Sequence, residues 1–289
     1  MDRTALRWLL ALSLLGSLSV HAASPVWAVR GAHNTVYLAG SIHMLPAADA
    51  QLPPGFAHAF ADSSTLVMEL DLGKFDALEA MSWMMDHGAL PPGRTLRGEL
   101  GEQRYARVSA AAGSLGVSIK GLDLQAPWVV GIEITDAAYT QAGFDPDQGV
   151  EEQLLRRAQG EGRATAGLES FEEEMQGLVG LSAPDQLRLL DQTLEDLKDL
   201  KAEMRDVLGA WRAGDATRLA GLLSEEYESF PSLYKPLVTD RNQRWLPQVQ
   251  ALLKEEHNSL VVVGALHLVG KGGLLELLRA QGYRITQLQ

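Results

Sequence analysis

The chain has 289 residues, a formal net charge of −12 and no cysteine, and 46% of its residues are apolar. The negative charge disfavours nucleic acid and anionic lipid as partners, because both would be repelled. The absence of cysteine excludes a disulfide framework and a thiol nucleophile, so stability must come from an apolar core.

The N-terminal segment has the features of a secretory signal. Arg3 and Arg7 give a basic start, and residues 8–18 form an apolar stretch too short to cross a bilayer comfortably. Small residues in Val20-His21-Ala22 predict cleavage after Ala22. We therefore expect a signal peptide over 1–22 and a mature domain over 23–289, periplasmic or secreted, without stable membrane insertion. An uncleaved anchor is the alternative.

Strand-like apolar runs recur along the chain with helical patterns between them. They are predicted at residues 35–39, 65–70, 117–122, 163–168, 260–263 and 283–288. A helix from about Gly273 to Gln281, closed by Gly282, lies between the last two. This alternation predicts an α/β fold with helices on the faces of a central sheet.

The middle of the chain has a helical pattern. From Ala183 to about Leu223 apolar residues recur at helical spacing, with charges between them. Ser182 as N-cap and Pro184 in the first turn mark a start. The pattern predicts one long helix or a helical hairpin, inserted between early and late strands. We expect a helical lobe or lid over about 183–256, with plain packing on the core as the alternative.

Two short segments place a histidine just after a predicted strand. They are Gly40-Ser41-Ile42-His43 and Gly264-Ala265-Leu266-His267. Ligands usually bind at the carboxyl edge of an α/β sheet, and imidazole can bind metal or move a proton. A third copy, Gly55-Phe56-Ala57-His58, follows two prolines and begins a helix, so we discount it. His43 and His267 are predicted to share one functional site; two histidines that cap strand ends are the alternative.

Carboxylates follow other predicted strands. Glu69 and Asp71 end one apolar run, where a carboxylate needs a cation, a metal or hydrogen-bond donors, unless it turns toward water. Glu169 ends another run, and either a functional role or a place at the helix N-terminus would fit it. The run Glu172-Glu173-Glu174 is typical of a solvated first helical turn, which suits the helix dipole.

Arg241 and Asn242 stand before or early in a helix that leads to Leu253. A guanidinium and an amide that point at a cleft could hold a carboxylate, phosphate or carbonyl oxygen. A surface salt bridge from Arg241 to Asp240 or a nearby glutamate is the alternative.

Two imidazoles with one or two carboxylates suit a divalent ion such as zinc, manganese, cobalt or iron. An ion with an open coordination position would activate water for hydrolysis. The same groups could work without metal, with a histidine as general base oriented by a glutamate.

Taken together, these motifs resemble the TraB/GumN family, which is related to the Tiki proteases. The similarity is carried in order by residues 37–46, with a G-[ST]-x-H-x-x-P pattern, and by 68–71, 166–169, 241–242, 263–270 and 273–288. It spans about residues 26–288. It implies a mixed central sheet flanked by helices, similar to the erythromycin-esterase and haem-binding ChaN relatives.

The resemblance also implies an activity, a metal-dependent hydrolase of peptidase-like character acting on a peptide or small-molecule substrate. His43, Glu69 and His267 would bind the divalent metal, which would be manganese, cobalt or zinc. Glu169 would be a further ligand or the general base, and Arg241 with Asn242 would stabilise an oxyanion or grip substrate. Two alternatives stay open: a non-catalytic periplasmic binding protein for a peptide, haem or other small ligand, and a metal-free esterase-like hydrolase.

Overall fold

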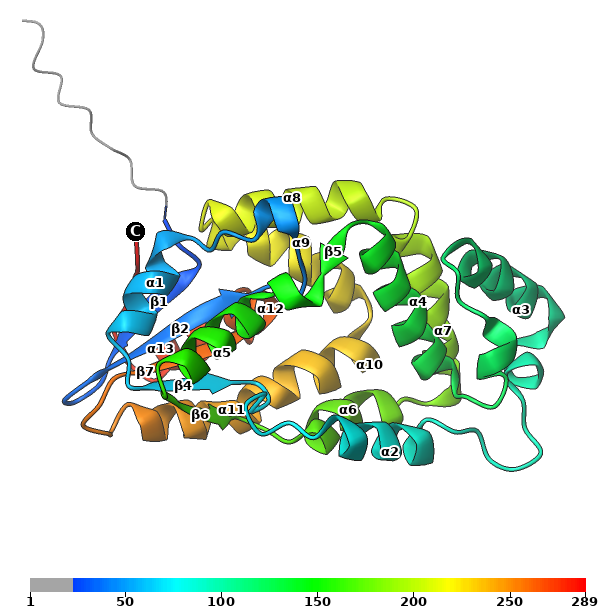
Figure 1. The fold of residues 1–289 in the computed structure, drawn as a ribbon, viewed down its shortest axis with the longest axis horizontal. Helices are drawn as coiled ribbons and strands as arrows, with labels where there is room; N and C mark the ends of the chain where they lie inside the picture. Colours follow the sequence, from blue (N-terminus) through cyan, green and yellow to red (C-terminus); the bar gives the residue numbers. More distant parts are fainter. Residues whose placement is uncertain (1–22) are drawn as a thin grey trace, which may run out of the picture.

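The fold is built on a six-stranded sheet with strand order β6-β4-β7-β2-β1-β8 (Figure 1). The computed structural model describes residues 23–289, apart from the side chains of residues 223–229, and the predicted signal peptide 1–22 lies outside the described residues. The strands of the sheet are β1 (Val26–Arg30), β2 (Thr35–Ser41), β4 (Thr65–Met68), β6 (Ala164–Gly167), β7 (Ser259–Gly264) and β8 (Ile285–Gln287). A separate two-stranded sheet pairs β3 (Leu45–Pro46) with β5 (Phe144–Asp145).

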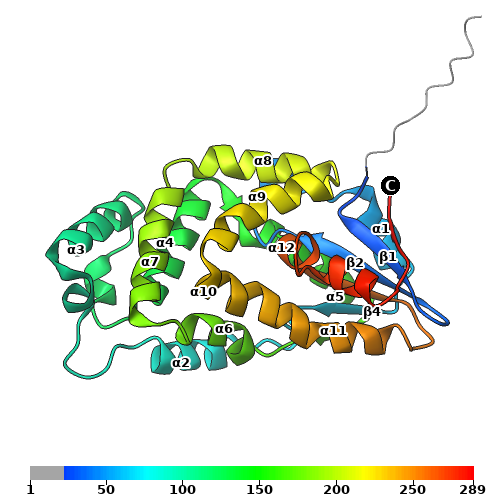
Figure 2. The same cartoon turned by 180° about the vertical axis from the view of Figure 1, so that it is seen from behind.

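Helices flank the sheet on both faces and extend beyond one end of it. They are α1 (Pro54–Ala61), α2 (Ala77–His87), α3 (Leu96–Ser114), α4 (Pro127–Gln141), α5 (Val150–Gly160), α6 (Phe171–Val179), α7 (Ala183–Asp196), α8 (Leu200–Arg212), α9 (Ala216–Ser229), α10 (Pro231–Tyr234), α11 (Asp240–Leu252), α12 (Ala265–Leu268) and α13 (Leu274–Ala280). Helices α1 and α5 lie over one face, and α11 and α13 over the other (Figures 1 and 2). The α/β prediction with a mixed, helix-flanked central sheet is therefore confirmed.

Four strands of the sheet run in the same direction. β4 pairs in parallel with β6 and β7, and β7 pairs in parallel with β2. β1 runs antiparallel to both β2 and β8, which makes the sheet mixed. Because parallel strands end at the same edge, the chain leaves β2, β4, β6 and β7 at one side of the molecule.

The strands that carry the two Gly-x-x-His segments are the most buried. Every residue of β2 and β7 is buried, as expected for parallel strands covered on both faces. The main core around them includes Trp211 of α8 and Trp245 of α11, both with no exposed surface. This core fixes the strand ends from which the candidate site is built.

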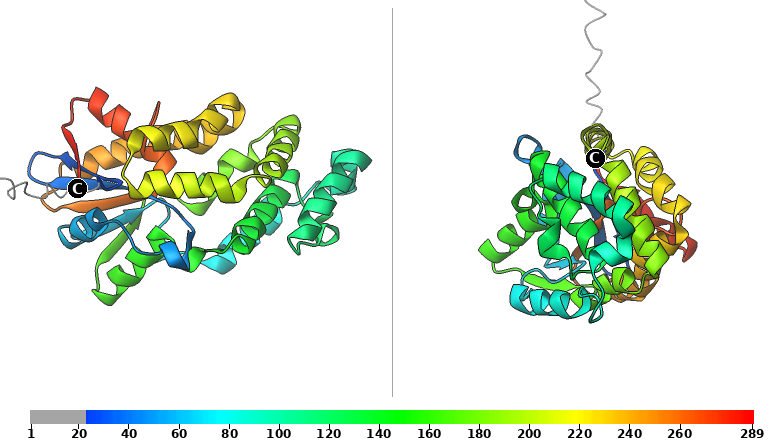
Figure 3. Two further views of the ribbon diagram at one scale, coloured as in Figure 1. Left: turned by 90° about the horizontal axis from the view of Figure 1, so that it is seen from above. Right: turned by 90° about the vertical axis from the view of Figure 1, so that its right-hand side faces the viewer.

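One predicted strand, residues 117–122, is wrong. The segment instead contains a 3-10 turn, Ile119–Leu122, which follows the end of α3. Gly116 ends that helix at φ 80°, and Ile119 packs into a separate cluster of helical residues. The segment lies at the end of the molecule farthest from the sheet (Figures 1 and 3). Its backbone therefore has no neighbouring strand with which it could pair, despite the alternating sequence pattern. Conversely, β1 was not predicted.

The predicted long helix or hairpin in the middle of the chain is divided into three helices, α7, α8 and α9. Ser182 caps α7 as predicted, since its hydroxyl accepts from the Asp185 amide at 3.3 Å. Gly214 separates α8 from α9 at φ 61°, a conformation that favours glycine. Helix α7 packs with α3 and α4 in the second cluster, through Leu190, whereas α8 and α11 pack on the main core.

None of the helices within residues 23–289 is both long and apolar enough to span a bilayer.

Candidate functional site

The parallel strand ends bring the predicted site residues to one edge of the sheet. Glu69 directly follows β4, His267 lies in the short helix α12 after β7, and His43 lies two residues beyond β2. Glu169 follows β6 and is joined to this edge, since its amide donates to the carbonyl of Glu69 at 3.0 Å. Positions separated by up to 224 residues in sequence thereby become neighbours.

Three of these side chains meet beside Gly264. A Cβ atom at Gly264 would lie 3.3 Å from Oε1 of Glu69, 3.5 Å from Nε2 of His43 and 3.6 Å from Cδ2 of His267. We call this space, bounded by those three side chains, the Gly264 niche. Glycine keeps it open because any larger residue would place a carbon atom there.

Glu69 is buried and ionised. Its Oε1 accepts from the Gly264 amide at 2.6 Å, and its Oε2 accepts from Arg241 at 2.5 Å. Burial by itself would raise the pKa of Glu69, but the charges of His267, Arg241 and His43 with the Gly264 hydrogen bond lower it to about 2. Since His267 is uncharged at neutral pH, Arg241, His43 and the Gly264 amide are the groups that keep Glu69 ionised there.

His267 is held in one tautomer by Asn242. The Asn242 amide nitrogen donates to the carbonyl of Gly272 at 2.9 Å, so its oxygen faces His267 Nδ1 at 2.8 Å and accepts a hydrogen bond from it. The other nitrogen, Nε2, therefore carries a lone pair, which faces Arg241 at 3.3 Å and Glu69 at 4.0 Å. Burial lowers the pKa of His267 to about 4, so the ring is neutral at pH 7.

Arg241 is buried among acidic groups. Its Nε donates to Glu169 at 2.7 Å, and its terminal nitrogen lies 3.4 Å from Glu174. Glu169 also accepts from Trp245 at 3.2 Å and from Arg244 at 3.3 Å, so both of its oxygens bind side chains of α11. These hydrogen bonds indicate that Glu169 anchors the side chain of Arg241. The alternative of a surface ion pair with Asp240 does not hold, because Asp240 pairs with Lys235.

A group of carboxylates surrounds the Arg241 guanidinium. Oxygens of Glu69, Glu169 and Glu174 lie within 4.8 Å of one another, a spacing that could hold a metal ion. However, one terminal nitrogen of Arg241 lies within 3.4 Å of all three. The guanidinium therefore already supplies the cation for these carboxylates. Of the imidazole nitrogens, Nε2 of His43 lies beside Gly264, whereas Nε2 of His267 faces Arg241.

Glu174 belongs to the site although its acidic run predicted a solvated turn. Glu172 and Glu173 do bond the N-cap Ser170. Glu174 turns inward, and burial, reinforced by the charge of Glu69, raises its pKa to about 7. A sequence signal was present, because Met175 and Leu178 place the apolar face of the helix next to position 174.

Glu151 is the second residue that the sequence did not identify. It lies in the first turn of α5, where Oε1 accepts from Nδ1 of His43 at 2.9 Å and from the Ser41 hydroxyl. Glu151 raises the pKa of His43 above its ordinary value, an effect that water moderates because the His43 side chain is 66% exposed. Leu154 and Leu155, three and four positions on, mark the same buried helix face.

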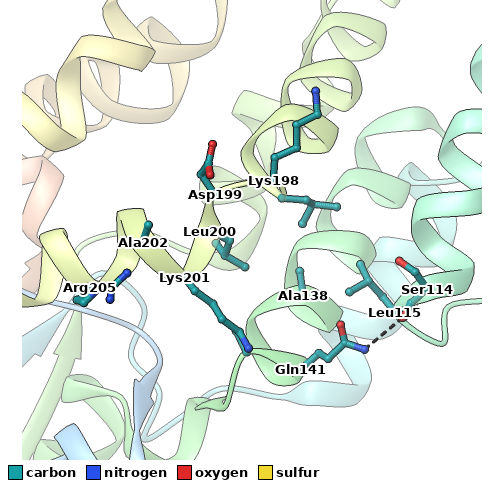
Figure 4. Close-up of a pocket in the computed structure, with 12 residues that line it drawn as sticks. Ser114, Leu115, Ala138, Gln141, Lys198, Asp199, Leu200, Lys201, Ala202 and Arg205 are labelled. Atoms are coloured by element: carbon teal, nitrogen blue, oxygen red, sulfur yellow. Dashed lines mark hydrogen bonds between the residues drawn. The ribbon is translucent and has the colours of Figure 1, made fainter.

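Asp71, the other strand-end acid, lies apart from these contacts and bonds Thr165 at 2.7 Å and Lys74 at 2.7 Å. A cavity of about 590 Å³ also lies elsewhere, where α8 begins beside α4 and the end of α3, with Lys201, Gln141 and Ser114 in its wall (Figure 4). None of the predicted site residues lines this cavity, so its size does not locate the chemistry.

Comparison with known proteins places the chain in a family. YbaP of Escherichia coli (strain K12), an uncharacterized protein, is 26% identical over 244 residues, which cover 84% of this chain and 87% of YbaP. YbaP of Shigella flexneri gives the same values. The metalloprotease TIKI2 of Danio rerio is 26% identical over 161 residues, 46% of this chain but 31% of TIKI2. No solved structure matches the chain. The model of the TraB/PrgY/gumN family matches residues 25–287, and the protein therefore belongs to this family.

Proposed function

We propose that this protein is an exported metal-dependent hydrolase of peptidase-like character, with His43, Glu69 and His267 as metal ligands. The observation that carries the proposal is the convergence of two imidazoles and one carboxylate on the Gly264 niche. The partial similarity to the metalloprotease TIKI2 supports the same chemistry.

The side chains beside Gly264 are of the types that bind a divalent ion, two imidazoles and one carboxylate. Glu69 is ionised, and His267 carries a lone pair on Nε2 because its Nδ1–H donates to Asn242. Imidazole nitrogens with a carboxylate oxygen suit manganese, cobalt or zinc. A bound ion of this kind supplies a Lewis acid that polarises a carbonyl group and activates water.

The neighbouring side chains have separate roles in this proposal. Arg241 lies beside both His267 and Glu69 and would stabilise negative charge that develops on a carbonyl oxygen. Asn242 acts through His267, whose ring it orients. Glu169 holds Arg241 in place, which its hydrogen bonds support better than the role of a base. Glu174, with a pKa near 7, is the carboxyl group that can exchange a proton at neutral pH.

The first test is the metal content of the mature protein, residues 23–289, after equilibration with manganese, cobalt and zinc. A double variant, His43→Ala/His267→Ala, is measured beside it. The matched control is His33→Ala/His257→Ala, which changes two exposed histidines that precede β2 and β7 at the opposite edge of the sheet. We expect about one ion per chain in the wild type and the control, and loss in the double variant.

Cleavage of a mixed peptide library then separates a hydrolase from a binding protein. We expect products with added metal, and their loss with a chelator or in the double variant. Metal that binds without any turnover would favour capture of a peptide, haem or other small ligand. Absence of metal from the wild type would refute the metal-dependent mechanism.

A second candidate, metal-free hydrolysis of an ester, is favoured by one observation. His43 is exposed and its Nδ1 is backed by the carboxylate of Glu151, an arrangement that suits a general base. This candidate predicts turnover that a chelator leaves unchanged.

Export is part of the proposal and is tested separately. We expect protein recovered from the periplasm or medium to begin at Ala23, after removal of residues 1–22. Recovery with the N-terminal segment intact would contradict this. The proposed substrate is a peptide or small molecule, and the acidic chain favours neither nucleic acid nor stable membrane insertion.

A further inference from the structure

The pairing of Glu151 with His43 is built into the backbone around it. The amide of Val150 donates to the carbonyl of Ile42 at 3.1 Å, which ties the first turn of α5 to the segment that carries His43. Glu151 is 7% exposed, and the hydroxyl of Ser41, the second residue of the first Gly-x-x-His segment, also donates to its Oε1. The end of β2, the first turn of α5 and the side chains of His43 and Glu151 are therefore joined at this point.

The environment of the second carboxylate oxygen of Glu151 indicates that this residue does not serve stability alone. Oε2 is buried and has no hydrogen-bond partner within the described part of the chain. A buried carboxylate oxygen without a partner costs free energy of folding. An apolar residue on this helix face would avoid that cost, so the contact with His43 is the feature that accounts for a carboxylate here.

The two histidines beside Gly264 are held by different kinds of acceptor. The Nδ1 of His267 faces the neutral amide of Asn242 at 2.8 Å, whereas the Nδ1 of His43 faces the carboxylate of Glu151 at 2.9 Å. In both cases Nε2 is the nitrogen without this acceptor; that of His43 faces the Gly264 niche, and that of His267 faces Arg241 at 3.3 Å. A carboxylate acceptor increases electron density on the opposite nitrogen of the ring more than an amide does.

We propose that Glu151 is a positioning residue of the site, which directs Nε2 of His43 into the Gly264 niche and makes His43 the stronger donor of the two histidines. The effect on metal binding rests on the function proposed above, whereas the pairing of Glu151 with His43 does not. Glu151 itself touches neither the niche nor a reacting atom.

The substitution Glu151→Gln tests the charge, because it gives His43 the same neutral type of acceptor that His267 already has. Binding of Co²⁺ is titrated by its visible absorption. Loss of a carboxylate behind a ligating histidine weakens metal binding by roughly 10- to 100-fold, and we expect a change in this range. Glu151→Asp, which keeps the charge on a shorter side chain, should recover part of the affinity.

The matched control is Glu152→Gln, the next residue on the same helix turn, which is half-exposed and pairs with Arg156 at 3.7 Å. We expect its Co²⁺ affinity to stay within about twofold of the wild type. If Glu151→Gln also stayed within that range, the proposal would be overturned.

A second readout does not depend on metal. In metal-free protein labelled with ¹⁵N-histidine, Glu151→Gln should move the ring nitrogen shifts of His43 and leave those of His267 unchanged. Unchanged His43 shifts would refute the pairing. If the wild type bound no Co²⁺ at its histidines, the metal-dependent function would fail, but these shifts would still decide whether Glu151 positions His43.

Discussion

The guanidinium of Arg241 lies among three carboxylates, those of Glu69, Glu169 and Glu174. Local sequence favoured a surface ion pair, because sequence alone does not distinguish a buried arginine from an exposed one. Removing one partner of a buried ion pair costs about 3–5 kcal/mol, since a buried charge is left uncompensated. Arg241 is therefore expected to contribute to the stability of the fold as well as to the proposed chemistry.

A single added methyl group at Gly264 tests whether the niche is the metal site. The φ of Gly264, −48°, is accessible to alanine, so Gly264→Ala changes the niche without straining the backbone. The added methyl would lie 3.3 Å from Glu69 and 3.5 Å from His43, where the proposed metal ion would bind. We expect metal affinity, measured by Co²⁺ titration, to fall at least about tenfold with the fold retained.

Gly113→Ala is the control for this change, because a Cβ there meets no atom within 4 Å. Metal affinity of Gly264→Ala within twofold of the wild type would place the ion away from the niche.

Tyr37 provides a pH-dependent prediction away from the site. Its hydroxyl donates to Asp62 at 2.6 Å. Burial is the larger cause and this hydrogen bond the second, and together they raise the pKa of Tyr37 from 10.0 to about 12. The hydrogen bond from protonated Tyr37 therefore stabilises the fold fully below pH 10. This contribution to the free energy of unfolding is lost as the pH rises toward 12. Tyr37→Phe should cost about 1 kcal/mol near pH 8, with the difference from the wild type shrinking above pH 10.

The measurement is the free energy of unfolding in urea between pH 8 and 11.5, with Tyr283→Phe as control. A difference that stayed constant or grew with pH would contradict the assignment.

At the scale of elements, α8 supports the end of β2. Trp211, fully buried in α8, donates from its indole nitrogen to the carbonyl of Gly40 at 2.7 Å, at the start of the first Gly-x-x-His segment. The regular spacing of apolar residues identified this region as helical. It did not determine that the helix breaks at Gly214 or that its face covers a strand end.

Trp211→Phe tests this support. The variant leaves the Gly40 carbonyl buried without its donor, so we expect a loss of about 2 kcal/mol in unfolding free energy and weaker metal binding. Trp83→Phe, on α2, is the control for a lost indole. Unchanged stability in Trp211→Phe would show that the hydrogen bond contributes nothing.

At the scale of the molecule, the niche joins parts of the chain that are far apart in sequence. A metal ion bound by His43 after β2 and His267 after β7 would connect the two strands at the centre of the sheet. A ligand at 100 times its dissociation constant stabilises the folded state by about 2.7 kcal/mol. For a domain of this size, we expect the unfolding temperature to rise by roughly 5–10 °C.

Thermal unfolding with Co²⁺ and with a chelator measures this effect. The rise should vanish in His43→Ala/His267→Ala and persist in the control His33→Ala/His257→Ala. An equal rise in all three proteins would indicate binding elsewhere.

The sequence by itself determined the α/β class and the positions of most strands in the sheet. It also gave the candidate residues that the fold brings together, namely His43, Glu69, Glu169, Arg241, Asn242 and His267. These follow from local patterns, because apolar runs, glycine and strand-end polar residues act over a few positions. It misplaced residues 117–122, since alternation alone does not supply a pairing partner. It also assigned Glu174 to solvent and missed Glu151.

Only the tertiary structure decided which of these groups touch. Three parallel strands, β2, β4 and β7, had to end at one edge before His43, Glu69 and His267 could face Gly264. The partners of each group, Glu151 for His43, Asn242 for His267 and the carboxylates for Arg241, lie on other elements of the fold. A local pattern can mark a buried helix face, as it does beside Glu174, but it cannot specify which charged groups meet there, because these come from distant parts of the chain.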